Sequence, residues 1–343
     1  MVFIPKPGRL DYNLPGAFRP ICLMSFPLKA VEKLIDRHIK ERALKLHPLH
    51  QGQFAYLPGK SVDAVLYSLV HRLEEAWARQ NIAAGLFLDI EGAFNYTSVE
   101  AIERAVERHG IDPTTRSGGE SRGCPQGGII SPLLWNLVVD ELIVKLNQRG
   151  FYTQAYADDL ATVVIARDAN TVSGLLRTAL EKIKRWCIEA ESNPTGSVKH
   201  LEVILDAKLS WGKQLDFACG RACALLWATK RICGKTWGIG PAMMRWLYTA
   251  LVRPLFMHGA LLWWNRTSLK SVRASLDYLQ GLASRLITGA IRTTPVVALG
   301  VALGLPPLHI MMEAAAMASA HRLKTGGQWK EAARENNKSH TTI

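Results

Sequence analysis

Three aspartates occupy positions where the sequence could support acid or metal chemistry. Asp158 and Asp159 are adjacent within Tyr152–Ala166, and Asp89 directly follows an apolar run, Ala83–Leu88. An Asp-Asp pair alone is most often ordinary turn chemistry. Two carboxylates about 4 Å apart repel by about 4 kcal/mol at an effective dielectric near 20, so convergence of all three would require a cation or raised pKa values. Carboxylate oxygens suit Mg²⁺, and two such ions can activate an attacking hydroxyl and hold a leaving group.

The segments around these aspartates predict the strands that would position them. Thr162–Ile165 is β-branched and apolar, which predicts a buried strand, and Tyr152–Tyr156 predicts its hairpin partner. The acid pair is therefore expected at the turn between the two strands, where a bend lets both side chains reach one site. Ala83–Leu88 predicts another buried strand, which ends at Asp89. Taken alone, Asp89 also fits a surface acid or a cap close to a helix.

A helix is predicted directly after the strand that ends at Asp89. It begins at Thr97, because Thr97 and Glu100 have capping-box spacing, and its apolar stripe continues to Gly110. The acid is therefore expected between a strand and a helix.

A glycine-rich loop precedes the next predicted helix, in the segment 122–135, RGCPQGGIISPLLW. Gly127 permits close approach of the backbone to a ligand, and Gln126 offers both a donor and an acceptor. Ser131 is a candidate helix cap and Pro132 a candidate first helical residue. Such a loop can bind an anion, and it can equally be a simple turn.

Apolar residues at helical spacing predict the remaining elements. One helix begins at Pro27, a second follows the turn-rich loop His50–Ser61, and a third covers Asn170–Cys187. The chain from Lys213 onward is predicted to be helical. The apolar positions are Leu28, Val31, Leu34, Ile35 and Ile39 in the first helix and Val65, Leu66, Leu69, Val70, Leu73 and Trp77 in the second.

The charge of the chain points to a polyanionic partner. Its 343 residues carry a formal net charge of +13 at pH 7. Nucleic acid is the expected partner, because phosphates reward clustered Lys and Arg through counterion release, and an anionic membrane is the weaker alternative. The most apolar region, Ile239–Trp264, is interrupted by Arg245, Arg253 and Pro254, so buried helices are expected and no membrane span. Six cysteines without a CxxC pair indicate reduced thiols in an intracellular protein.

Five ordered sequence blocks resemble those of one enzyme family. The blocks are FIPKPGR, RPICLMS, LDIEGAF, GCPQGGIISPLLW and YADDLATVV. Together they resemble the reverse transcriptases of non-LTR (LINE-like) retrotransposons, particularly those of insect elements. Five blocks in this order are far more specific than a lone Asp-Asp pair.

The resemblance implies an α+β fold of the right-hand polymerase type. Residues 1–80 would form the fingers, whose N-terminal part could be truncated. Residues 81–210 would form the palm with an antiparallel sheet. Residues 211–325 would form a helical thumb or connection, followed by a polar tail over residues 326–343. The implied activity is RNA-directed DNA polymerisation on an RNA template with a DNA primer and dNTPs. The implied location is the nucleus, with a ribonucleoprotein stage in the cytoplasm.

The resemblance also assigns the carboxylates. Asp89 and Asp158 match the main metal ligands, and Asp159 matches the third carboxylate of the site. The implied cofactor is a pair of Mg²⁺ ions, for which Mn²⁺ can substitute.

Five further residues match positions that bind the incoming nucleotide. Phe94 matches the aromatic residue beneath the sugar, where its ring would collide with a ribose 2′-hydroxyl and so favour dNTPs. Gln126 and Gly127 match the block that lines the dNTP and template. Lys6 and Arg19 match basic residues of the fingers near the triphosphate. The structural alternative for Lys6 and Arg19 is a solvated surface position, and the alternative for Phe94 is an aromatic residue of the core.

The sequence departs from the family pattern at several points. Asn95 stands where the family has a second Asp, and the connector between Arg116 and Arg122 is shorter than usual. Residues 193–197 replace a family segment that carries a lysine and leads into another strand, and Lys199 is only a weak substitute for that lysine. These contractions favour an alternative function, a catalytically inactive relic that still binds nucleic acid. They also predict a palm that lacks an internal strand.

Overall fold

The structure is a computed structural model, and it groups the chain into two compact units. One unit comprises Met1–Val65 and Ala76–Val198, and the other comprises Leu66–Glu75 and Lys199–Ile343. The residues that the structure describes are 1–6, 11, 13, 17–91, 97–111, 124, 126–190, 193–196, 199–201, 203–206, 208–232 and 238–329, without the side chains of 91, 193–196, 199 and 200.

A four-stranded antiparallel sheet forms the centre of the first unit. Its strands are β3 (Ile82–Glu91), β4 (Tyr152–Tyr156), β5 (Asp159–Ala166) and β6 (Asn193–Gly196), in the order β4-β5-β3-β6. The predicted hairpin of β4 and β5 is confirmed. The strand predicted to end at Asp89 is also present, but it continues to Glu91, so Asp89 lies within β3 and not after its end. Asp159 is already the first residue of β5, so only Asp158 of the acid pair belongs to the turn itself.

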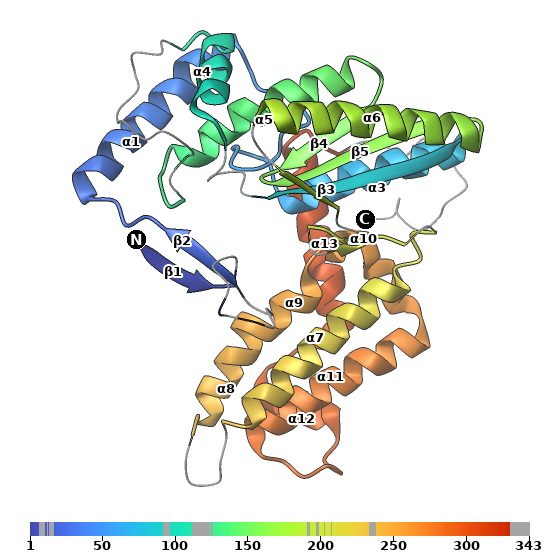
Figure 1. Ribbon diagram of the computed structural model, residues 1–343. Helices are drawn as coiled ribbons and strands as arrows, with labels where there is room; N and C mark the ends of the chain where they lie inside the picture. Colours follow the sequence, from blue (N-terminus) through green and yellow to red (C-terminus); the bar gives the residue numbers. More distant parts are fainter. Residues whose placement is uncertain are drawn as a thin grey trace. The chain divides into compact units, whose positions relative to one another are not determined.

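Helices cover one face of this sheet. α5 (Ser131–Asn147) and α6 (Ala169–Glu189) lie across it, and α4 (Val99–Arg108) packs against α5 (Figure 1). The core between sheet and helices takes Leu88 and Ile90 from β3 and Leu160 and Val164 from β5. Side chains alternate between the two faces of a strand, so the residues between these positions point away from the helices.

The residues that break the family pattern after α6 form a strand. Residues 193–196, which break the family pattern, form β6 and pair with β3, with Thr195 opposite Asp89. Pairing of β6 covers the edge of β3 and satisfies backbone groups that would otherwise be exposed at a sheet edge.

The helix predicted to begin at Thr97 begins at Val99. Ser98 is its N-cap and accepts a hydrogen bond from the backbone N–H of Ala101 at 3.2 Å, so the cap lies one residue later than the capping-box spacing indicated. Thr97 is almost fully buried. The N-cap of α5 is likewise not Ser131 but Ile130, which makes no side-chain cap hydrogen bond.

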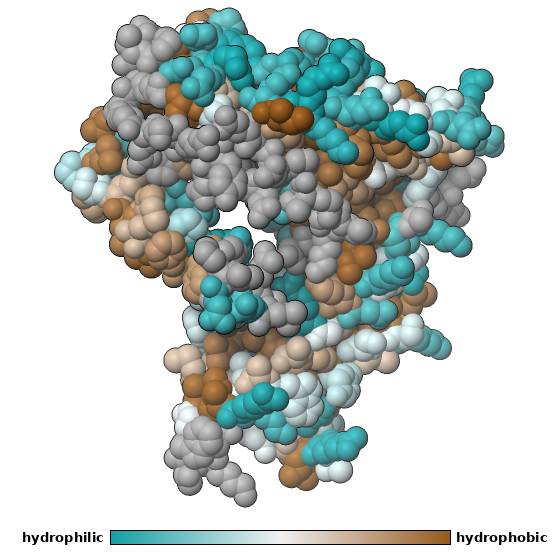
Figure 2. Space-filling view, viewed as in Figure 1, coloured by the Kyte–Doolittle hydropathy of each residue, from teal (hydrophilic) through white to brown (hydrophobic). Residues whose placement is uncertain are grey.

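The N-terminal segment carries an apolar surface. β1 (Val2–Pro5) pairs with β2 (Phe18–Ile21), and α1 (Phe26–His38) continues through a π-helical turn, Ile39–Ala43, into the short α2 (Leu44–Leu46). Hydrophobic residues gather over β1, β2 and α1 in Figure 2. The predicted apolar stripe of α1 is only partly buried: Ile39 is in the core, whereas the most exposed members are Leu28, Val31 and Leu34.

The second unit is mostly helical. It holds the two-stranded ladder of β7 (Lys199–His200) and β8 (Val203–Ile204) and the middle of α3 (Val62–Ala78). Its centre contains the fully buried side chains Trp211, Tyr248, Phe256 and Trp263. The other helices are α7 (Gly212–Lys230), α8 (Pro241–Leu247), the π-helix Tyr248–Val252, α9 (Arg253–Met257), α10 (Ala260–Trp263), the 3₁₀ turn Trp264–Ser268, α11 (Lys270–Thr288), α12 (Val296–Leu303) and α13 (Leu308–Thr325).

A buried amide joins three segments of this unit. Gln280 of α11 donates to the carbonyls of Leu305 and Pro306 at 3.2 and 3.0 Å, and its oxygen accepts from the N–H of Leu308 at 3.0 Å. The start of α13 is thereby held against α11. Among the described residues no single helix is long and apolar enough to cross a membrane; α12 and α13 meet that test only as a pair bent by 51°.

The cap of α4 gives a stability prediction. Ser98→Ala removes the acceptor for the Ala101 N–H and should lower the free energy of unfolding by about 1 kcal/mol. Ser98→Thr keeps a hydroxyl at the same position and should retain most of that stability. Urea unfolding followed by circular dichroism measures both, and equal stability of Ser98→Ala and the parent protein would contradict Ser98 as the cap.

Candidate active site

Asp89 and Asp159 lie directly opposite each other on neighbouring strands. The register of β3 and β5 pairs their Cα atoms, and the next step of the ladder joins the N–H of Ile90 to the carbonyl of Asp158 at 3.0 Å. Directly opposed residues in an antiparallel pair have Cβ atoms about 4.5–5.5 Å apart on one face. Leu88 and Leu160 face the helices, so Asp89 and Asp159 face the other side of the sheet.

The turn that carries Asp158 is fixed by a tryptophan of α5. Ala157 has φ +56°, a backbone conformation that residues other than glycine rarely adopt. Its carbonyl accepts a hydrogen bond from Nε1 of Trp135 at 2.8 Å. Trp135 is almost fully buried and meets Trp186 of α6 edge to face, with ring centroids 6.4 Å apart. Asp158 itself is exposed at the tip, while Asp89 and Asp159 are half-buried.

The donor set fits a hard divalent cation in its chemistry. Three carboxylates from one strand and one hairpin supply only oxygen ligands, as Mg²⁺ requires. The backbones of the three residues lie close together, because Asp89 pairs with Asp159 and the N–H of Ile90 donates to the carbonyl of Asp158. In the described part of the chain, no three Asp, Glu, His or Cys side chains converge closely enough to hold one metal ion.

The loop of Gln126 and Gly127 is held by the N-terminal segment. The carbonyl of Gln126 accepts from the N–H of Cys22 at 2.8 Å, just after β2. Gly127 has φ +107°, and a Cβ at this position would lie 2.8 Å from the carbonyl oxygen of Cys22. Only glycine therefore allows β2 to approach the loop this closely.

A buried carboxylate holds the other end of the same loop. Glu32 of α1 accepts a hydrogen bond from the N–H of Ile129 at 2.7 Å and is 7% exposed. Ile129 precedes α5, whose first backbone N–H groups have no partner within the helix. An anion at a helix N-terminus also interacts favourably with the helix dipole. Glu32 therefore holds the loop just before α5 without capping a backbone N–H of the helix itself.

The basic residues predicted for nucleotide binding lie on the β1–β2 hairpin. Arg19 is exposed on β2, opposite Ile4. Lys6 follows β1, and its backbone N–H donates to the carbonyl of Ala17 at 2.8 Å. The structure brings this hairpin to the Gln126 loop through Cys22. Phe94 lies outside the described residues.

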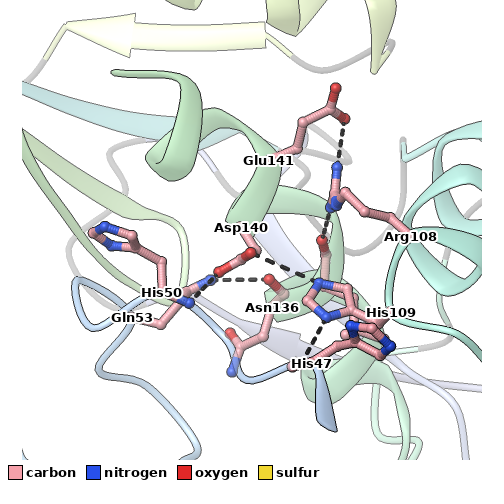
Figure 3. A network of polar contacts seen from close by, with 9 residues as sticks. His47, His50, Gln53, Arg108, His109, Asn136, Asp140 and Glu141 are labelled. Carbon is pink, nitrogen blue, oxygen red and sulfur yellow. Dashed lines mark hydrogen bonds and ion pairs between the residues drawn. The ribbon is translucent and has the colours of Figure 1, made fainter. Parts of the chain in front are cut away.

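A buried polar network on α5, which the sequence analysis did not single out, supports the edge of this site (Figure 3). Asp140 accepts from the backbone N–H of His50 at 2.7 Å and lies 3.7 Å from Nε2 of His109. The side-chain amide of Asn136, one turn earlier, donates to the backbone carbonyl of Ala55 at 2.8 Å. The backbone carbonyl of Asn136 accepts from the side-chain amide of Gln53 at 3.0 Å. The available signal was the pair of polar residues at i, i+4 among the apolar positions of this helix.

This network holds residues 52–55 beside β4. Gln53 forms a parallel bridge with Ala155, whose backbone exchanges hydrogen bonds with Phe54 at 3.0 Å and Gly52 at 2.8 Å. The two bridged segments run in the same direction, and Tyr56 and Asp158 each lie three residues beyond the bridge, so they follow it side by side. Burial raises the pKa of Tyr56, and the charge of Asp158 raises it further. Tyr56 is therefore a neighbour of the candidate site that the sequence analysis missed.

These features lie within a recognised sequence family. The family described as Reverse transcriptase (RNA-dependent DNA polymerase) matches residues 4–193, which is more than half of the chain. The chain belongs to this family. The matched range includes both strands of the carboxylate pair, the Gln126 loop and the β1–β2 hairpin from Ile4 onward.

Its relatives are retrotransposon proteins of insects, as the resemblance implied. The "Retrovirus-related Pol polyprotein from type-1 retrotransposable element R1" of Bradysia coprophila is 23% identical over 329 residues, covering 81% of this chain and 32% of that protein. The "Putative 115 kDa protein in type-1 retrotransposable element R1DM" of Drosophila melanogaster is 25% identical over 363 residues, covering 91% and 34%. The chain therefore spans about a third of the length of these curated relatives.

One more relative and one solved structure are also similar to the chain. The "Probable RNA-directed DNA polymerase from transposon BS" of Drosophila melanogaster is 21% identical over 345 residues, covering 84% of this chain and 38% of that protein. A solved structure of telomerase from Candida albicans in complex with a fragment of telomeric RNA aligns with 92% of this chain and 63% of its own, at 9% identity and a TM-score of 0.36. That structural likeness is too weak to support an argument about the fold.

The close approach at Gly127 gives a mutational prediction. Gly127→Ala adds a Cβ that meets the Cys22 carbonyl, in addition to the strain of a positive φ. Gly150 is the matched control, because it has φ +84° and open space around a Cβ. The clash should cost roughly 1–3 kcal/mol more at position 127 than at position 150 in urea unfolding. Equal costs for Gly127→Ala and Gly150→Ala would contradict the tight contact.

The buried network gives a pH prediction. Burial raises the pKa of Asp140, an effect that bonds and charges from His50, His109 and Arg108 only partly offset. A raised folded-state pKa means that the ionised carboxylate costs stability, and this cost appears as pH rises through the ordinary value near 3.8 towards the raised one. Asp140→Asn keeps an acceptor for the His50 N–H and loses the charge. Its stability relative to the parent should therefore increase between about pH 3 and pH 7.

Glu141 provides the control of opposite sign. Burial raises its pKa, but ion pairs with Lys145 and Arg108 more than compensate, and the net pKa is lowered. The stability of Glu141→Gln relative to the parent should therefore fall over the same pH range. Denaturant unfolding at several pH values measures both differences. A pH-independent difference for Asp140→Asn would be incompatible with a raised pKa.

Proposed function

We propose that this chain is the polymerase portion of a non-LTR retrotransposon protein and catalyses RNA-directed DNA synthesis. The observation that carries the proposal is the opposed pair of Asp89 and Asp159, with Asp158 at the adjoining turn, inside the range that matches the reverse transcriptase family. The substrates are a dNTP and the 3′-hydroxyl of a DNA primer paired to an RNA template. The arrangement is a right-hand polymerase with fingers over residues 1–80, palm over 81–210 and thumb over 211–325.

Asp89, Asp158 and Asp159 are the proposed ligands of two Mg²⁺ ions, which Mn²⁺ can replace. When bound, such a pair of ions stabilises both the attacking and the leaving oxygen of the displacement. The three side chains do not converge in the structure, so metal binding requires them to rotate, whereas the paired strands and the braced turn hold their backbone in place. The bond between Trp135 and Ala157 supplies that brace for Asp158.

The nucleotide is proposed to lie against the Gln126 loop. Gln126 and Gly127 present backbone and amide groups to the base or template, and Arg19 and Lys6 bind the triphosphate from the β1–β2 hairpin. The contacts of Cys22 with Gln126 and of Glu32 with Ile129 support this role, because they fix the loop relative to the hairpin and α1. Phe94 is proposed to exclude a ribose 2′-hydroxyl.

Primer extension on an RNA template tests the proposal. Asp158→Asn keeps the shape of the side chain and removes its charge. The loss of a metal-binding carboxylate should cost about 4 kcal/mol of transition-state stabilisation, which is roughly a thousandfold in rate. Asp168→Ala is a matched control, because Asp168 is an exposed acid that caps α6 through Thr171 in the same unit. This control should affect stability and leave the rate of extension within about twofold.

The alternative function is nucleic-acid binding without catalysis. It is favoured by Asn95 and by the short connector between Arg116 and Arg122. Protein that is folded by circular dichroism and binds a template–primer duplex, but gives no Mg²⁺-dependent product, would establish this alternative and overturn the polymerase proposal. Extension that depends on Asp158 would exclude it.

A further inference from the structure

The positive charge of the chain is concentrated in one part of the sequence. Residues 1–207 contain 24 Lys and Arg and 24 Asp and Glu, so their formal charges cancel. Residues 208–329 contain 15 Lys and Arg against only 3 Asp and Glu. This segment lies within the second unit. The electrostatic attraction for a polyanion therefore belongs to the helical unit and not to the unit that carries the aspartates.

The same unit contains a large open hollow. It has a volume of about 980 Å³ and lies where α7 and α8 meet the C-terminal half of α11 and the loop after it. The three helices lie side by side (Figure 1). Ligand pockets span about 300–1,000 Å³, so the hollow is large enough for part of an extended ligand.

Cations without acidic partners line this hollow. Lys230, Arg285 and Arg292 are among its lining residues, and none of the described residues that line it is Asp or Glu. Within the described part of the chain, none of these three side chains forms an ion pair. Arg285 is half-buried, with its guanidinium nitrogens close above Gly281 of the preceding turn. An Arg that is partly withdrawn from water and lacks a carboxylate is well suited to a phosphate.

Two exposed aromatic rings complete the lining. Trp227 of α7 is 46% exposed, and the Lys230 ammonium lies 4.7 Å from the centroid of its ring. Tyr278 of α11 is 57% exposed and also borders a second, smaller hollow next to Cys219 and Cys223. Large exposed aromatic rings beside cations are typical of surfaces on which unpaired bases stack while phosphates meet the charges.

We propose that this hollow binds an unpaired segment of RNA. A duplex cannot use the aromatic rings, because its bases already stack on one another, whereas an unpaired base can place its face on Trp227 or Tyr278. Phosphates on either side of that base would meet Lys230, Arg285 and Arg292. The assignment to RNA in preference to DNA rests on the proposed function, in which RNA is the template. The hollow is thus a second nucleic-acid site, separate in character from the contacts that a thumb makes with a template–primer duplex.

Binding of a labelled oligo(U) of about 12 nucleotides, within the size range of known single-strand sites, tests the proposal. Fluorescence anisotropy is measured on the full chain in EDTA without dNTPs. Trp227→Leu and Tyr278→Leu should each raise Kd by at least about fivefold, the lower end of the loss of one stacking contact. Trp246→Leu is the matched control: Trp246 is 57% exposed on α8 and does not line the hollow. Its Kd should be unchanged.

The charged residues have a separate signature. Arg285→Gln should make log K fall less steeply with log salt, by about 0.7 in slope, as expected for one phosphate contact to a single strand. This readout does not depend on the aromatic residues, so it tests the site even if one aromatic variant fails to fold.

Three outcomes would overturn the proposal. One is an equal effect of Trp246→Leu and Trp227→Leu, another is a hairpin duplex that competes as well as oligo(U), and the third is oligo(dU) binding more tightly than oligo(U). Because the assay needs neither metal nor dNTPs, failure of primer extension would count against the proposed polymerase and leave this result unaffected. Conversely, unchanged binding by the Trp227 and Tyr278 variants would remove this site and leave the polymerase proposal intact.

Discussion

The candidate site depends on the register of β3 and β5. Asp89 faces Asp159 only because Leu88 pairs with Leu160 and both of these leucines enter the helix-covered core. A slip of one residue would reverse the faces and bring a carboxylate into that core while exposing the leucines. Burial of an unpaired charge is far more costly than any surface interaction could repay. Hydrophobic burial on one face of the sheet therefore fixes the position of the charged pair on the other.

α5 links this register to the rest of the unit. Its start is stabilised by Glu32 from α1, its first turns reach the hairpin tip through Trp135, and its middle holds the 52–55 segment through Asn136 and Asp140. Each of these contacts joins segments more than twenty residues apart or crosses a tight turn. They share the same physical basis, because a buried polar group must find a partner or cost stability. One apolar helix with a few well-placed polar groups thus sets the positions of several loops.

The two units differ in chemistry. The unit with the aspartates has 22 Lys and Arg against 20 Asp and Glu, a small excess, whereas residues 208–329 carry most of the positive charge. The positive charge that attracts a nucleic-acid backbone therefore lies mostly outside the unit that contains the three aspartates of the candidate site. It also gives the exposed aromatic residues of α7 and α11 a setting in which phosphates accompany any base that stacks on them.

The sequence by itself determined the family, the hairpin of Tyr152–Tyr156 and Asp159–Ala166, the strand of Asp89 and most helices, because these follow from local periodicity and short motifs. It missed the cap at Ser98, the strand of residues 193–196, the hydrogen bond of Glu32 to the loop before α5 and the neighbourhood of Tyr56 and Asp158. Those features depend on segments distant in sequence, so only the tertiary structure decided them. The roles of Asp89, Asp158 and Asp159 remain proposals, since periodicity and packing place side chains without specifying their chemistry. The physical reason for the division is that local propensity acts within one element, whereas satisfaction of buried polar groups acts between elements.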